Sequence, residues 1–104
     1  MVESNWTELG GKQVRYAGHT WELSGAVEVR ESGELLATEA QQAGDVRGET
    51  AMLFFRLENP PDSLNAGHLG EHFDRLERTA DGYRLVVKTD PRTYRYELQR
   101  MEYV

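Results

Sequence analysis

Three side chains in the segment HLGEH, residues 68–72, have the chemistry of metal ligands: His68, Glu71 and His72. On an α-helix the two histidines would lie one turn apart, at about 6 Å, with Glu71 beside them. On a β-strand they would lie about 13 Å apart, and Glu71 would point to the opposite face. Only a helix would therefore allow these side chains to share a metal ion.

The neighbouring sequence argues against a helix of useful length. The two glycines in and beside this segment each disfavour a helix interior by about 1 kcal/mol relative to alanine. The dipeptide Asp81-Gly82 is a strong signal for a β-hairpin, and it would place Leu76 in a strand opposite Val87. We therefore expect a loop with at most one helical turn through residues 63–71, and then a strand from about residue 73.

The spacing H-x-x-E-H resembles that of the inverted zinc peptidases. The resemblance covers five residues, and it implies a large protein with a third zinc ligand, a glutamate several dozen residues after the motif. Only 32 residues follow His72. We therefore expect no catalytic residue, no bound metal and no cofactor, and keep a metal-dependent hydrolase using His68 and His72 as the weakest alternative.

The polar side chains of the connection at residues 59–73 can also have a purely structural role. They can hydrogen-bond to backbone groups of a surface loop, as Asp74 can just after it. Long ordered loops nevertheless carry function more often than short ones. We therefore take Asn65, His68, His72 and Asp74 as candidate binding residues.

A second constellation lies near the end of the chain, where RTYRYELQR interleaves arginines with Tyr94 and Tyr96. Aromatic rings that stack on bases, beside arginines that contact phosphates, are the parts of a surface that binds single-stranded nucleic acid. Strand alternation puts both tyrosines on the face opposite Arg95. If the tyrosine face is the core, no stacking platform exists, so a single-stranded nucleic-acid binder using Tyr94, Tyr96 and Arg95 is an alternative rather than the main hypothesis.

The composition limits the class of protein. A chain of 104 residues is long enough for a single domain, which we place at residues 1–104. The 18 acidic residues outnumber the 12 basic ones, giving a net charge of −6, which argues against general binding to nucleic acid or to anionic membranes. There is no cysteine, no long apolar run and no segment laid out like a signal peptide, so we expect a cytoplasmic protein.

Period-two alternation dominates the rest of the chain and predicts strands. Residues 21–30 alternate apolar and polar side chains, with a bend or bulge expected at Gly25. Gly10-Gly11 suggests a hairpin, and Ala17-Gly18-His19 a turn. We count about eight short strands, and expect an all-β, mainly antiparallel protein: a small barrel or sandwich of about six to eight strands with at most one short helical turn.

The segment AMLFFRL, residues 51–57, is apolar on both faces. This marks a central strand or one face of an interface. It carries more apolar surface than a thin barrel wall needs, and an apolar second face indicates a partner, most simply another copy of the chain. The sequence thus favours a binding or assembly module that self-associates or binds a protein partner, rather than an enzyme.

The segments SLNAGHLGEHFDRLER and YELQRMEYV resemble a family of short uncharacterised, conserved hypothetical proteins from halophilic archaea. The use of 10 Arg against 2 Lys, the absence of Ile and Cys, and the acidic surplus agree with such an origin. The resemblance implies a cytoplasm at molar salt, where the Debye length is about 3 Å. It brings no activity and no catalytic residue with it.

Overall fold

Strands make up most of the fold. The computed structural model describes residues 5–44, 48–62, 64, 66–89 and 92–104, and of residues 66–68 it describes the backbone alone. Within that part of the chain the strands are β1 (Gln13–Tyr16), β2 (His19–Arg30), β3 (Leu35–Gln42), β4 (Thr50–Leu57), β5 (Phe73–Thr79), β6 (Gly82–Lys88) and β7 (Thr93–Tyr103). Three short 3₁₀ helices accompany them: η1 (Asn5–Leu9), η2 (Glu31–Gly33) and η3 (Ala66–His72).

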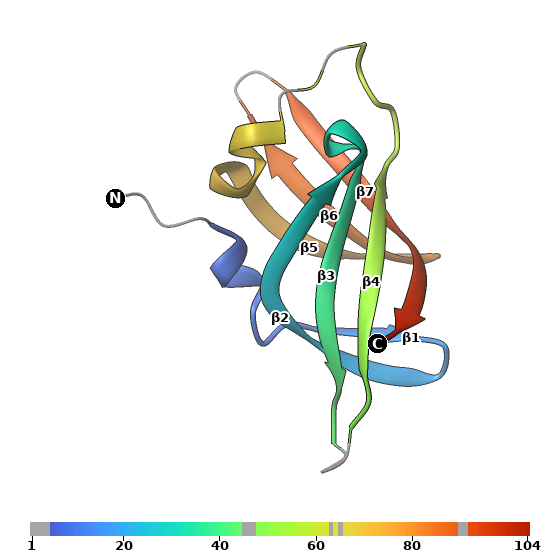
Figure 1. The fold of residues 1–104 in the computed structure, drawn as a ribbon. Helices are drawn as coiled ribbons and strands as arrows, with labels where there is room; N and C mark the ends of the chain where they lie inside the picture. Colours follow the sequence, from blue (N-terminus) through green and yellow to red (C-terminus); the bar gives the residue numbers. More distant parts are fainter. Residues whose placement is uncertain (1–4, 45–47, 63, 65, 90–91) are drawn as a thin grey trace.

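The seven described strands pair antiparallel in a single sheet of order β1-β2-β3-β4-β7-β6-β5. The sheet curls into a half-barrel, in which β2, β3 and β4 form one wall and β5, β6 and β7 the other (Figure 1). The predicted all-β, antiparallel class is confirmed. Because the strands form one curled sheet, the arrangement is an open barrel and not a sandwich.

The opening between the two ends of the sheet is occupied by 3₁₀ helices. Helix η1 packs against β2 on one side and β5 on the other, and η3 packs against η1 and β6 (Figure 1). Trp6 of η1 lies against Phe73 at the start of β5, with ring centroids 5.4 Å apart. These contacts join the two walls without strand pairing.

The inner, concave face of the sheet holds the main core. Its fully buried large side chains include Trp21, Leu53, Phe55, Leu85 and Tyr96, on β2, β4, β6 and β7. Alternate residues of the same strands point away from this core, as the pleat of a strand requires. We call the face that they form the outer face.

Gly25 breaks the regular register of β2. The pairing of β2 with β3 shifts between Leu23 and Val27, and Gly25 has φ +89°. A Cβ at this position would lie 3.1 Å from the backbone nitrogen of Gly10 in the turn after η1. The predicted bulge is confirmed, and its cause is the close approach of η1 to β2.

The prediction of a hairpin at Gly10-Gly11 is wrong. Residues 5–9 form η1, a helix with three residues per turn, so Trp6 and Leu9 lie on one face and both are buried. The turn predicted at Ala17-Gly18 is confirmed. Both residues have positive φ, which is the conformation of a type I′ hairpin.

The start of β5 follows the prediction, but the connection before it and the hairpin after it differ. Strand β5 begins at Phe73, whereas η3 covers seven residues, which at three residues per turn is more than the single helical turn that we expected. The hairpin closes at Thr79 and Gly82, so the turn lies one residue earlier than we expected. Leu76 therefore lies opposite Leu85 and not Val87, because moving a turn by one residue moves the pairing by two.

Candidate interaction surface

The outer face of β3 and β4 carries an apolar cluster separate from the core. Leu35, Ala37 and Phe54 are buried there, and Met52 packs against them. The exposed face of an antiparallel sheet normally carries polar side chains. We call Leu35, Ala37, Met52 and Phe54, together with the arginines described next, the Phe54 patch.

Two arginines cover the ring of Phe54. The guanidinium carbon of Arg100 on β7 lies 4.7 Å from the ring centroid, and that of Arg30 on β2 lies 5.5 Å from it. Phe54 is left 1 % exposed. Guanidinium groups are attracted to the face of an aromatic ring, and their aliphatic stems cover apolar surface. The chain thus buries an outward-facing phenylalanine with its own charged side chains.

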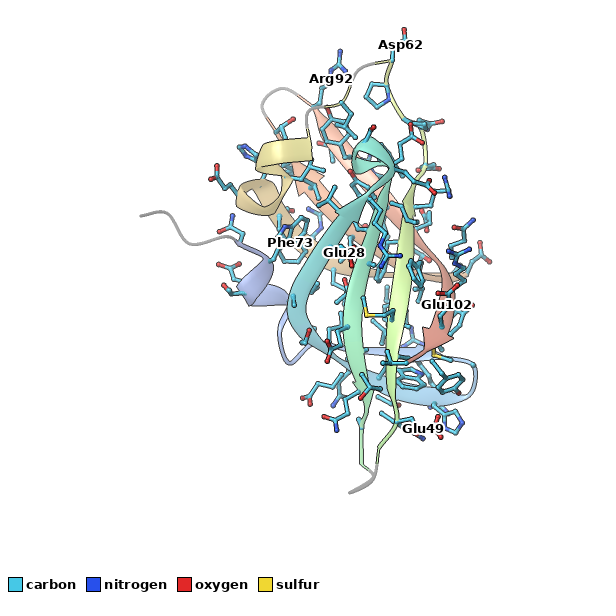
Figure 2. The ribbon with its side chains drawn as sticks, in the orientation of Figure 1. Glu28, Glu49, Asp62, Phe73, Arg92 and Glu102 are labelled. Atoms are coloured by element: carbon cyan, nitrogen blue, oxygen red, sulfur yellow. The ribbon has the colours of Figure 1, made fainter. Side chains whose placement is uncertain are left out.

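Each of these arginines has an acidic neighbour on its own strand. Arg30 donates a hydrogen bond to Glu28 at 3.0 Å, and Arg100 lies 3.7 Å from Glu102. Glu28 and Glu102 lie on either side of β3 and β4 (Figure 2). The hydrogen bond and the charge of Arg30 lower the pKa of Glu28. These pairs are exposed, so they contribute little to stability.

A shallow hollow borders the patch at the bulge of β2. Its volume is about 210 Å³, and it is lined by Ala26, Val27, Glu28, Ala37, Glu39 and Met52. Because the side chains of Ala26 and Ala37 are small, they leave a depression beside the larger Met52. The outer face therefore offers both a raised part, at Phe54 and its arginines, and a recess next to it.

The other half of the outer face is charged and internally paired. Glu77, Arg84, Glu97 and Arg56 lie side by side in register across β5, β6, β7 and β4. Arg84 contacts Glu97 at 2.7 Å and Glu77 at 3.8 Å. Alternating opposite charges in cross-strand positions stabilise a solvated sheet face. This half has the character of a surface in contact with water.

The structure does not give HLGEH the geometry of a metal site. Residues of the segment lie in η3, and a 3₁₀ helix brings positions i and i+3 to the same face rather than i and i+4. His72 is exposed at the end of η3. Asn65 and the side chain of His68 lie outside the described residues. Among the side chains that are described, no group of three or more His, Asp or Glu could hold a metal ion.

Asp74 lies apart from that segment, on the outer face of β5. Its carboxylate contacts Arg75 and lies 3.8 Å from Lys88. It sits at an irregularity where the pairing with β6 shifts between Phe73 and Arg75. Asp74 thus takes part in the charged half of the outer face.

The two tyrosines of β7 face the core. Tyr96 is fully buried, and its hydroxyl donates a hydrogen bond of 2.7 Å to the carbonyl of Gly33. Tyr94 is half-buried and packs against the core, while Arg95 is exposed on the opposite face. A base cannot stack on Tyr96, so the structure does not bring these three residues together as a nucleic-acid platform.

The sequence pattern pointed to Met52 and Phe54 but missed Arg30 and Arg100. Their partnership with Phe54 depends on the neighbours of β4 in the sheet, for which the local sequence has no signal. Comparisons of the chain with protein-family models, with curated proteins and with solved structures found no match. In the described ranges, no helix combines the length and apolar character needed to cross a membrane.

Proposed function

We propose that this protein is a small binding and assembly module that associates with a second copy of itself through the Phe54 patch. The observation that supports this proposal is the burial of Phe54 on the outer face by Arg30 and Arg100. Aromatic residues, methionine and arginine are the types enriched in protein interfaces. Phe54, Met52 and the two arginines supply all three types on one surface.

A second sheet face would bury the surface around Met52 that the monomer leaves in contact with water, while Leu35, Ala37 and Phe54 are already buried. Met52 is half-buried, and Ala26 and both arginines are exposed. Removing apolar surface of this kind from water stabilises a complex by roughly 25 cal/mol per Å². The hollow of about 210 Å³ beside Met52 gives such a partner a depression to fill.

Sedimentation of the whole chain from about 5 to 500 μM tests the proposal. We expect a reversible dimer, with Met52→Glu weakening it at least tenfold, because the added carboxylate would be desolvated in the interface next to Glu39 and Glu102, its cross-strand neighbours. Thr79→Glu is the matched control, since Thr79 is a half-buried position on β5, away from the patch. It should change the dissociation constant less than threefold. A wild-type chain that stays monomeric at the highest concentration would overturn the proposal.

The proposal includes a cytoplasmic location at high salt. It is supported by the Arg-rich, Ile-free composition and by the net charge of −6. At molar salt, charge pairs that stay exposed are screened, whereas pairs enclosed in an interface are screened much less.

A further inference from the structure

We infer that the two copies meet about a twofold axis parallel to β3 and β4, so that Glu28 of one copy pairs with Arg100 of the partner subunit. This inference rests on the self-association proposed above and specifies its geometry. It comes from one row of residues that crosses the Phe54 patch. Glu28 pairs in register with Ala37, Ala37 with Phe54, and Phe54 with Arg100.

The row has opposite charges at its ends and residues of unequal size at its centre. Glu28 on β2 and Arg100 on β7 are both exposed, while Ala37 and Phe54 between them are buried. Neighbouring strands lie about 4.8 Å apart, so the row is about 14 Å long. An interface between identical copies must be complementary to itself, and this row meets that condition in one orientation.

A twofold axis that lies in the interface, parallel to the strands and midway between β3 and β4, exchanges the two ends of the row. Glu28 then faces the partner's Arg100, so opposite charges meet twice. Phe54 and Ala37 are already buried in the monomer, so the charged ends of the row carry the complementarity. Aligned packing of two sheets is a common arrangement in β proteins.

A twofold axis that runs across the strands is the other way to pack the two faces. It would place each residue of the row opposite the same residue of the partner. Glu28 would then face the partner's Glu28, and Arg100 would face the partner's Arg100. Like charges brought together at an interface are unfavourable, so the charge pattern selects the first axis. The ion pairs that Glu28 and Arg100 make within the monomer, with Arg30 and Glu102, are exposed and exchange at little cost. The guanidinium of Arg100 also lies over the ring of Phe54.

Charge reversal tests the pairing. Glu28→Arg and Arg100→Glu alone should each weaken the dimer at least tenfold, because each puts like charges opposite one another twice. The double variant should return to within threefold of the wild type. A mixture of the two single variants should form a heterodimer, because both of its charge pairs are again opposite. Glu22→Arg makes the same charge change on the outer face of β2, outside the patch, and should have less than a threefold effect.

Sedimentation at 0.15 M salt, with circular dichroism to verify the fold of each variant, separates the outcomes. Heterodimer formation and recovery in the double variant support the inference. Dimers of unchanged strength in all variants would overturn it and leave self-association standing, with the contact elsewhere. Single variants that are weak and that neither the double variant nor mixing restores would overturn the axis. A monomeric wild type would overturn the proposed function as well.

Discussion

Tyr96 joins the last strand of the chain to the connection between β2 and β3. Its ring is fully buried on the inner face, and its hydroxyl reaches the carbonyl of Gly33 in η2. Burial raises the pKa of the Tyr96 phenol, and Tyr94 nearby adds to the effect. Tyr96, which the sequence suggested as a stacking surface for a base, is thus a structural residue that makes one hydrogen bond, to Gly33.

Tyr96→Phe should destabilise the fold by about 1–2 kcal/mol, because the buried Gly33 carbonyl loses its donor. The wild type should also lose stability as the pH rises above about 10, the ordinary value for tyrosine. The sign follows from linkage: the folded state holds the phenol proton more tightly than the unfolded chain, so this contribution is full below that pH and falls as the phenol ionises.

Urea unfolding at pH 8 and pH 11 measures both effects. Tyr96→Phe should show a smaller loss of stability between the two pH values than the wild type. Tyr103→Phe, at a tyrosine that is 56 % exposed, is the matched control and should behave like the wild type within about 0.5 kcal/mol. Equal losses in Tyr96→Phe and the wild type would contradict the assignment.

Among the elements, η1 has the largest influence on how the sheet is closed. It occupies the opening between β2 and β5, with Trp6 on Phe73. Its approach to β2 is so close that a Cβ added at Gly25 would lie 3.1 to 3.3 Å from backbone atoms of Trp6 and Gly10. The bulge in β2 and the helix are therefore two parts of one arrangement.

Gly25→Ala should destabilise the fold by about 2–4 kcal/mol, from positive φ and from crowding against the backbone together. Gly11→Ala is the matched control: Gly11 has φ +83°, but its added Cβ would meet nothing within 4 Å. It should therefore cost only the conformational part, about 1–2 kcal/mol. Denaturant unfolding of both variants gives the comparison. Equal costs would show that η1 does not constrain β2.

Most strands were predictable because their pattern is local. Alternation located β2, and the apolar stretch of β4 predicted a central strand, which lies fourth of seven in the sheet. Helix η1 was missed because Trp6 and Leu9, three residues apart, look like part of any short apolar segment. The register of β5 and β6 was missed because it depends on which two residues form the turn, and Ala80-Asp81 competed with Asp81-Gly82.

At the scale of the whole molecule, charge is distributed by face as well as by sequence. The charged half of the outer face balances its own ions across β5, β6 and β7, whereas the Phe54 patch holds apolar side chains on β3 and β4, three of them buried. The net charge of −6 is left without compensation over the molecule as a whole. Self-repulsion of this kind is reduced by salt.

Raising NaCl from 0.1 to 2 M should therefore raise the thermal unfolding midpoint by about 5 °C or more, corresponding to roughly 1 kcal/mol for a domain of this size. Scans at a fixed low protein concentration keep association from contributing. A non-ionic osmolyte at the same osmolality is the control, and it should give a smaller shift. A midpoint that falls with salt would contradict the proposed adaptation to high salt.

The sequence by itself determined which residues of β2 turn inward, because the period of two is a property of the local backbone. Trp21 and Leu23 could be assigned to one face before any neighbour was known. Only the tertiary structure decided that β7 lies beside β4, which brings Arg100 over Phe54 and completes the row from Glu28. Pairings between segments tens of residues apart depend on the order and register of the sheet, and no local pattern contains that information.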